Sequence, residues 1–368
     1  MKIPAVDFRP LLDATEPAWR ARLAELFGRM NFVLGEQVRG FETEFAAAMG
    51  AKHCVTVGTG TAAIEIALRD AGIHYPAQEV IAPALTAPFT GVAIASTGAR
   101  IRFADIDPDT LLLDPEDAAG RATRATAAIV PVHLYGQVCD LLAIRSLARK
   151  LGAVVVQDAC QAHGVLFRGK PLTAFSPYVA YSFYPTKNLG ALGDGGAIVT
   201  NHARAAARMS SYRDGGRVPG TQIAGTPGQN SRLDEMQACY LRAFLPKLAE
   251  WNAHRARIAR IYTAALSGLD GITPVRTSTS VWHLFVVRAR RRDKLRQHLA
   301  SHGIGTGIHY PVPLHLMPAF TGCGLKRGDL PHAEKACKEI LSLPLYPYLT
   351  EAAAHEVVGR IRQFLGRD

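Results

Sequence analysis

The sequence lacks the apolar segments that mark secreted and membrane-spanning proteins. Its first residues, Met-Lys-Ile-Pro-Ala-Val-Asp, contain no apolar stretch of the kind that a secretory signal needs. No uninterrupted apolar run approaches the roughly 20 residues that cross a bilayer. We therefore expect a cytoplasmic protein that has no membrane partner.

Cysteine is scarce and scattered in this chain. None of the cysteines forms a C-x-x-C pair, so the pattern favours neither a zinc site nor a disulfide framework. We expect no metal site, and small buried thiols in a reducing compartment. The six cysteines are Cys54, Cys139, Cys160, Cys239, Cys323 and Cys337.

Acidic residues are fewer than basic ones, which gives a formal net charge of +11 and a pI of about 9.5. Such a surface could attract an anionic substrate or a nucleic acid. The arginines are spread along the chain, however, and the densest cluster is only Arg288 with Arg290, Arg291 and Arg292. There is no helix-turn-helix or zinc-finger pattern. We therefore interpret the cluster as a solvated face and expect no nucleic-acid partner.

Internal repeats and low-complexity segments are also absent, and what remains is a regular alternation of short apolar runs with helical patterns. Alternation of this kind predicts crossover connections and a mostly parallel, doubly wound α/β sheet. Helices are expected at 61–71 and 141–150. The expected strands are 53–57, 79–82, 101–106, 127–132, 153–157, 179–183 and 196–200.

The pattern changes after residue 231. A long helical stretch over 231–266 is followed by a strand at 281–289 and by helices at 293–302 and 351–365. These elements predict a smaller α+β unit. We place a large α/β domain at 1–248 and a small C-terminal α+β domain at 249–368.

Two residues that follow predicted strands carry the first chemical signal. Asp158 ends the apolar run Val-Val-Val-Gln, and Lys187 lies shortly after the strand at 179–183. Open α/β folds bind ligands at the carboxyl ends of their strands. A lysine that forms an imine and an aspartate that pairs with a pyridinium nitrogen suit pyridoxal 5'-phosphate (PLP).

A turn rich in glycine and threonine follows the first strand and opens a helix, which is the setting in which backbone amides bind phosphate. It contains Gly60, Thr61 and Ala62, and it is neither a P-loop nor a G-x-G-x-x-G motif. Ser182 could add a hydroxyl to the same phosphate. Each of these features is ordinary when it occurs alone: a glycine turn, an aspartate that caps a helix and a lysine on the surface. The prediction therefore rests on their order along the chain.

Longer motifs resemble those of the DegT-type (DegT/DnrJ/StrS) sugar aminotransferases, which are PLP enzymes of fold type I. The resemblance covers nearly the whole chain. The matching segments are Phe32-Val-Leu-Gly, Gly60-Thr-Ala, Pro131-Val-His-Leu-Tyr-Gly-Gln, Gln157-Asp-Ala-Cys-Gln-Ala-His-Gly, Ser182-Phe-Tyr-Pro-Thr-Lys-Asn-Leu-Gly, Asn230-Ser-Arg-Leu-Asp-Glu, Trp282-His-Leu-Phe, Gly305-Thr-Gly-Ile-His-Tyr-Pro-Val-Pro-Leu-His-Leu and Leu343-Pro-Leu-Tyr-Pro.

The resemblance implies a role for each matching residue. Lys187 is the Schiff-base lysine and proton carrier, Asp158 holds the pyridine nitrogen, and Gln161 contacts the ring hydroxyl of PLP. Thr61, Ala62 and Ser182 hold the phosphate. Asn230 reaches that phosphate from the other subunit, which implies a homodimer with shared active sites. The residues implied to border the substrate are His163, Tyr184, His309 and Tyr310.

Two departures from the family pattern bear on the substrate. Many relatives carry an aromatic residue directly after the threonine of a Pro-x-x-Thr segment, where it stacks on the cofactor ring. Here Thr86 is followed by Ala87, and Phe89 is the candidate that could supply the stack. Many relatives also carry a Tyr-x-His before the asparagine motif, which this chain lacks.

The implied activity is transfer of an amino group from glutamate or glutamine to a keto-sugar, a nucleotide-linked keto-deoxysugar aminated at carbon 3. One alternative is a keto-cyclitol acceptor used with the same chemistry. Another is a PLP-dependent dehydration, although relatives with that outcome replace the lysine with histidine. An alternative of a different class is a non-catalytic regulatory or binding protein on the same fold. His163 could also be a core residue, and His309 could be a capping residue in a loop.

Overall fold

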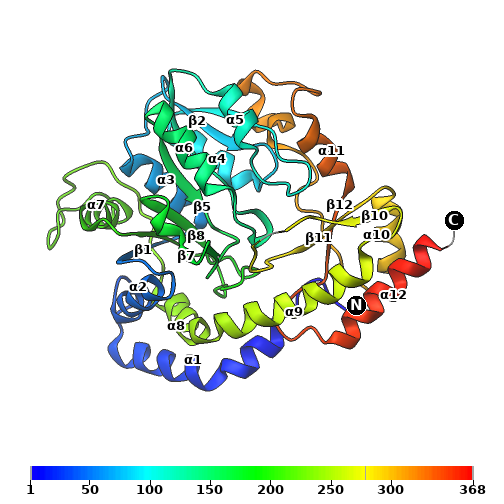
Figure 1. Cartoon of the computed structure of the whole chain (residues 1–368). Coiled ribbons are helices and arrows are strands. Elements are labelled where there is room, and N and C mark those ends of the chain that lie inside the picture. The colour runs from blue at the N-terminus through cyan, green and yellow to red at the C-terminus, as the bar shows by residue number, and fades with distance from the viewer. Residues whose placement is uncertain (1, 278, 367–368) are drawn as a thin grey trace.

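A seven-stranded sheet forms the centre of the larger part of the molecule (Figure 1). The structure is a computed structural model, and it describes residues 2–277 and 279–366. The strands lie in the order β1-β9-β8-β5-β4-β2-β3, and only β9 runs antiparallel to its neighbours. The prediction of a mostly parallel α/β sheet is therefore confirmed. The strands are β1 (His53–Val57), β2 (Glu79–Pro83), β3 (Arg100–Ala104), β4 (Thr126–Ile129), β5 (Val154–Asp158), β8 (Tyr178–Ser182) and β9 (Gly196–Thr200).

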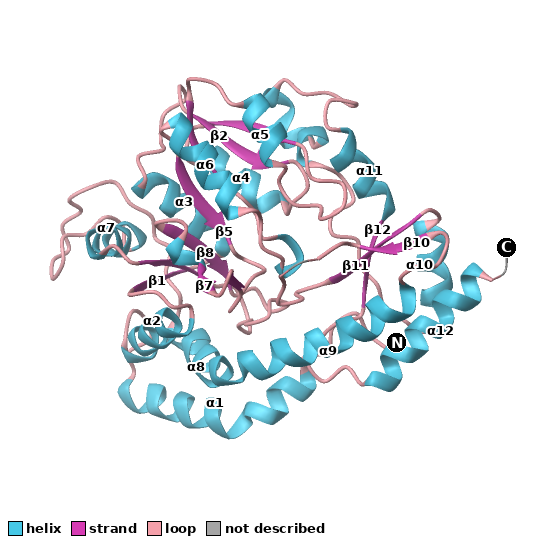
Figure 2. Ribbon diagram, in the orientation of Figure 1, coloured by secondary structure: helices cyan, strands magenta, loops and turns pink. Residues whose placement is uncertain are grey.

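Helices cover both faces of this sheet, as Figure 2 shows. One face packs on α3 (Gly60–Asp70), α4 (Pro88–Ser96) and α7 (Ala203–Arg213). Burial on both faces explains why the strands are almost continuously apolar rather than alternating. The opposite face packs on α2 (Glu36–Ala48), α5 (Pro115–Arg121), α6 (Leu141–Leu151), α8 (Glu235–Phe244) and α11 (Pro331–Glu339).

The first two helices were not predicted. α1 (Arg9–Arg29) buries only Thr15 and Leu26 and contains a proline, so it lacks the apolar periodicity by which a helix is recognised. The start of α2 is held from a distance. The carboxylate of Glu235 accepts hydrogen bonds from the amides of Gly35 (2.7 Å), Gln37 (2.8 Å) and Val38 (3.0 Å). A side chain 200 residues away therefore replaces a local cap.

A smaller unit contains an antiparallel three-stranded sheet. The strands β10 (Ile272–Pro274), β11 (Phe285–Ala289) and β12 (Ile340–Leu343) pack against α9 (Leu248–Leu266), α10 (Arg292–Ser301) and α12 (Glu351–Leu365). β11 begins later than expected, because Trp282 adopts a left-handed conformation (φ 51°) that is incompatible with an extended strand. The smaller α+β unit is thus present.

One continuous helix, α9, contributes residues to the cores of both units. Leu248 and Trp251 of α9 pack into the core of the large sheet, whereas Ile258 and Tyr262 pack into the core of the small sheet. Ile3 also belongs to the small core, so the start of the chain joins the C-terminal unit. Division at 248/249 stays a prediction. No described helix is long and apolar enough to cross a membrane.

Candidate active site

Three strand ends meet at the carboxyl edge of the large sheet. β1 leads into the turn before α3, β5 ends at Asp158, and β8 ends at Ser182. β5 and β8 are parallel neighbours, with Asp158 opposite Ala180. The three segments that carry the predicted cofactor residues are therefore adjacent in space, although more than 120 residues separate Gly60 from Ser182 in sequence.

Asp158 is buried, with 4% of its surface exposed, and neutral donors hold its carboxylate. Thr90 Oγ1 donates to Oδ2 (2.8 Å), and the Cys160 amide donates to Oδ1 (3.1 Å). Among the described residues, no lysine, arginine or histidine forms an ion pair with Asp158. A buried carboxylate without a cation is costly, so this site suits a cationic ligand such as a pyridinium ring.

Lys187 lies in the loop after β8, where its amide donates to the carbonyl of Tyr184 (2.9 Å). Burial lowers the pKa of its amine, whereas Cys160 and Asp158 act in the opposite direction. A lowered pKa raises the fraction of neutral amine, which is the form that attacks a carbonyl. Lys187 thus has the electrostatic setting of a nucleophile.

The turn before α3 forms a cradle against β8. A Cβ atom added at Gly60 would lie 2.6 Å from Ser182 Cβ and 2.9 Å from Cys160 Sγ, so only glycine permits this approach. Thr59 caps the helix, and its hydroxyl accepts from the Ala62 amide (3.0 Å). The amides of Gly60 and Thr61 are left for an anion, since the first turn of a helix has no internal partners for them.

Gln161 is held in a defined orientation. Its Oε1 accepts a hydrogen bond from the Tyr135 amide (2.7 Å), which leaves Nε2 as the donor toward the site. Nε2 lies 3.4 Å from the hydroxyl of Tyr310, so the small unit contributes a side chain beside Gln161. Burial, with the negative charge of Asp158, raises the pKa of Tyr310 to about 12. Tyr310 therefore remains a neutral phenol at physiological pH.

His309 adjoins the same site from the small unit. Its Nδ1 lies 2.9 Å from Ser342 Oγ, and Tyr135 donates its hydroxyl hydrogen to the His309 carbonyl. Burial, together with the charge of Lys187, lowers the pKa of His309 to about 4. Its ring is neutral at physiological pH and is close enough to Lys187 to be affected by its charge.

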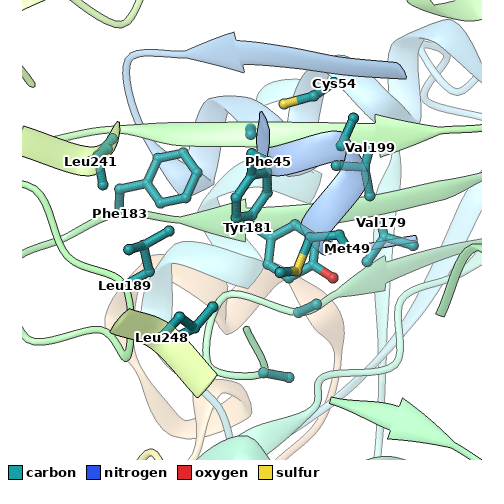
Figure 3. Packing of buried hydrophobic residues seen from close by; sticks show 14 of the residues in the cluster. Phe45, Met49, Cys54, Val179, Tyr181, Phe183, Leu189, Val199, Leu241 and Leu248 are labelled. Atoms are coloured by element: carbon teal, nitrogen blue, oxygen red, sulfur yellow. The ribbon is translucent and has the colours of Figure 1, made fainter. Parts of the chain in front are cut away.

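His163 lies in the core beneath the site, and its contact with the substrate stays a prediction. The ring is fully buried, and neither of its nitrogens has a hydrogen-bond partner among the described residues. It packs against Phe45, Tyr181 and Phe183, with centroid separations of 6.4, 5.2 and 5.9 Å. Figure 3 shows these three aromatic residues within the core. Burial, followed by the charge of Lys187, lowers the pKa of His163 to about 3.

Three predicted site residues lie on the surface. Phe89 is 64% exposed and Tyr184 is 52% exposed. Asn230 is exposed as well, and the next residue, Ser231, accepts a hydrogen bond from the Gly58 amide (3.1 Å). Asn230 is thus held near the turn that precedes α3. The proposed stack of Phe89 and the contacts of Tyr184 and Asn230 stay predictions.

Several residues that shape the site were not predicted. They are Thr59, Thr90, Tyr135, Asn188 and His283. The sequence carried a signal for some of them, because Tyr135, Asn188 and His283 lie within motifs that match the family. Thr90 had no such signal, since its bond to Asp158 joins α4 to β5.

Metal ligands do not cluster in the described parts of the chain, where no three histidine, cysteine or acidic side chains form a group able to hold an ion. His315, six residues after His309, is instead paired with Glu334 (3.2 Å) in the interior.

The doubly wound sheet, with a lysine, a buried aspartate and a phosphate cradle at its carboxyl edge, defines a PLP-dependent enzyme of fold type I. The chain belongs to the DegT/DnrJ/EryC1/StrS aminotransferase family, which it matches over residues 16–362. It is thus an aminotransferase, and the predicted family, fold and cofactor are confirmed.

Similar proteins span almost the same length. The chain is 42% identical to a pleiotropic regulatory protein of Geobacillus stearothermophilus, covering 99% of both chains. It is 41% identical to the dTDP-3-amino-3,4,6-trideoxy-alpha-D-glucose transaminase of Streptomyces venezuelae, covering 100% of this chain and 97% of the relative. The crystal structure of S. venezuelae DesV in complex with a ketimine intermediate superposes with a TM-score of 0.97, at 41% identity over 100% of this chain and 99% of DesV.

Proposed function

We propose that this aminotransferase moves an amino group from glutamate or glutamine to the keto carbon of a nucleotide-linked deoxysugar, at carbon 3. The observation that carries the proposal is that Lys187, whose pKa is lowered by burial, and a buried Asp158 without an ion-pair partner among the described residues lie at the same edge of the sheet. The Streptomyces venezuelae relative, whose name specifies a 3-amino deoxysugar, supports the sugar and the carbon.

We assign a separate chemical role to each residue at the edge of the sheet. PLP, when bound, supplies a ring that accepts electrons from the substrate carbon. Asp158 would hold the pyridine nitrogen in its protonated form, with its carboxylate oriented by Thr90. Lys187 would be the residue that holds the cofactor and would carry a proton at its amine. Gln161 would donate through Nε2 to the ring oxygen, because its Oε1 already accepts from the Tyr135 amide.

The phosphate end is held separately. We assign the phosphate to the amides of Gly60 and Thr61 and to the hydroxyl of Ser182, because Gly60 lies against Ser182. The helix N-terminus adds favourable charge there. Because the Ala62 amide donates to Thr59, we assign Ala62 a packing role rather than a direct contact. Affinity for the cofactor and reactivity of its ring therefore depend on different residues.

We further propose a homodimer in which Asn230 of each subunit completes the partner's phosphate site. The exposure of Asn230, which leaves its side chain accessible to a partner subunit, supports this. Mixing Asn230→Ala with Lys187→Ala protein tests it. A mixed dimer contains one site with both changes and one with neither, so activity should reappear on mixing. An active monomer in ultracentrifugation would contradict the proposal.

A screen in the reverse direction tests the substrate. Purified enzyme is incubated with aminated sugar nucleotides and a keto-acid acceptor, and release of the keto-sugar is followed. We expect turnover with a dTDP-3-amino-deoxysugar and none with the 4-amino isomer. Turnover with amino-cyclitols alone would establish the second candidate, a keto-cyclitol aminotransferase.

A regulatory protein on this fold is the candidate of another class, favoured by the name of the Geobacillus stearothermophilus relative. The intact Lys187, Asp158 and Ser182 of this chain oppose a purely regulatory role. Visible absorbance that changes when glutamate or glutamine is added would support catalysis, whereas a colourless protein would favour regulation.

A further inference from the structure

A buried chain of hydrogen bonds connects the loop of Lys187 to the small unit. Asn188, the next residue, is 1% exposed, and its Nδ2 donates to Asn252 Oδ1 (2.8 Å) and to the Val281 carbonyl (2.8 Å). Its Oδ1 lies 3.0 Å from His283 Nδ1. Asn252 in turn donates from Nδ2 to the carbonyl of His163 (2.9 Å).

The direction of these bonds determines the tautomer of His283. Asn188 Nδ2 donates both of its hydrogens to oxygen atoms, which identifies the other atom of the amide, Oδ1, as the oxygen that faces His283. An amide oxygen can only accept, so His283 Nδ1 must donate to it. Burial, followed by the charges of Lys187 and Arg255, lowers the pKa of His283 well below its usual value. The ring is therefore neutral, with its hydrogen on Nδ1 and a lone pair on Nε2.

The backbone of His283 is also fixed. Arg255, a buried residue of α9, donates from Nη1 to the His283 carbonyl (3.3 Å) and to the Leu345 carbonyl (2.8 Å). A Cβ atom added at Gly136 would lie 2.8 Å from the His283 nitrogen, so the two backbones touch. The backbone of His283 is thus held by residues of both units, independently of the bond between its ring and Asn188.

We propose that His283 is a positioning residue that directs the Lys187 amine by holding the side chain of Asn188. The bonds from Asn188 to His283, Val281 and Asn252 hold the side chain of the residue next to Lys187, and Asn252 links it to the segment that carries Asp158. The lysine and the aspartate are thereby held relative to each other. The inference rests on the proposed function and adds a residue that does not touch the reacting atoms.

Three substitutions at residue 283 separate positioning from general stability. His283→Leu removes the donor, and we expect kcat to fall about 10- to 100-fold with little change in KM, because misplacement by about 1 Å has an effect of that size. The visible band of the bound cofactor should shift, and borohydride trapping on Lys187 should slow. His283→Asn places an amide donor where Nδ1 lies and should restore kcat, band and trapping. His283→Gln places its donor near the position of Nε2 and should not restore them.

His315→Leu is the matched control. His315 is also a buried histidine of the C-terminal part of the chain, and within the described residues its ring forms a hydrogen bond only with Glu334. This variant should lower the melting temperature of the apoprotein as His283→Leu does, but leave band position and trapping rate unchanged.

Equal kcat, band position and trapping rate in the Asn and Gln variants would overturn the proposal, even if His283→Leu fails to fold. Failure of the proposed function gives a different result. If Lys187 is not the cofactor lysine, wild-type protein shows no trapping on Lys187, and if only the acceptor differs, the substrate screen fails while trapping on Lys187 persists.

Discussion

Two regions of the molecule differ in how far the chain itself covers them: the carboxyl edge of the large sheet and the exposed arm formed by residues 215–230. At the edge, Asp158, Gln161 and Ser182 are buried, and each side chain has a defined partner within the chain. The arm is mostly exposed, with Ile223 67% accessible, and it is shaped by backbone hydrogen bonds such as the one from the Val218 amide to the Ile223 carbonyl (2.9 Å). One chain therefore specifies the cofactor chemistry, whereas the arm has a surface that the chain itself does not cover.

The arm nevertheless has a defined backbone. Gly216 adopts φ 70°, and a Cβ atom there would lie 1.8 Å from the Thr226 carbonyl oxygen. A side chain at this position is excluded, so the arm folds back only because of a glycine. Apolar side chains on a structured but uncovered arm are consistent with a partner subunit as its cover.

The largest expected effect is at the edge itself. Lys187→Ala should fold but lose activity by more than about 10³-fold, since a positioned proton carrier alone contributes about 10²–10⁴-fold. Circular dichroism and melting temperature check the fold, and steady-state assays check the loss. Retention of wild-type turnover by this variant is incompatible with the account.

Asp158→Asn should slow the half-reaction with the amino donor by about 10²- to 10³-fold while much of the cofactor affinity remains. Asparagine keeps the shape of the side chain but removes the charge that stabilises a protonated ring, and the phosphate cradle is untouched. Single-turnover kinetics measure the rate, and equilibrium dialysis measures the affinity. A variant that binds the cofactor and reacts at the wild-type rate would remove Asp158 from this role.

Thr90→Val removes the hydroxyl that donates to Asp158 Oδ2. A hydrogen bond to a charged group contributes about 1.5–3 kcal/mol, so we expect the half-reaction to slow by at least about 10-fold. Thr90→Ser keeps the donor and serves as the control, with a rate near that of the wild type. Equal rates in the Val and Ser variants would show that Asp158 does not depend on Thr90.

Phe89→Ala tests whether an exposed aromatic residue covers the cofactor. If Phe89 stacks on the ring, the dissociation constant of PLP should rise by up to about 10-fold, since aromatic contacts contribute about 0.5–1.5 kcal/mol. Tyr75 is exposed to a similar extent, and Tyr75→Ala is the control with no expected change. Unchanged affinity for PLP in both variants would show that residues other than Phe89 cover the face of the cofactor ring.

His163→Phe should have the smallest effect on activity, because the ring lies in the core. The folded-state pKa of about 3 lies below the ordinary value of 6.5, so the unfolded chain takes up a proton first as the pH falls. Stability that is present above pH 6.5 is therefore lost as the pH drops toward 3. His163→Phe should recover about 2 kcal/mol of that loss at pH 5, measured by denaturant unfolding at pH 7 and pH 5. A loss of turnover with unchanged stability would instead support a contact between His163 and the substrate.

The sequence predicted those parts of the molecule whose position can be inferred from neighbouring residues along the chain. Asp158 and Lys187 follow apolar strands, and Gly60 follows a strand and opens a helix, so the position of each could be inferred from its neighbours. α1 was missed because most of its residues are not buried, and α2 because the cap of its first turn comes from Glu235. The burial of His163 could not be predicted, because a motif in the turn after β5 gives no information about the direction in which a ring points.

Borohydride reduction of the wild-type holoenzyme, followed by peptide mapping, tests whether Lys187 is the cofactor lysine. We expect the reduced cofactor to be attached to a single peptide, at Lys187, and Lys187→Ala protein to carry no label. Attachment to any other lysine, or no attachment in wild-type protein, would contradict it.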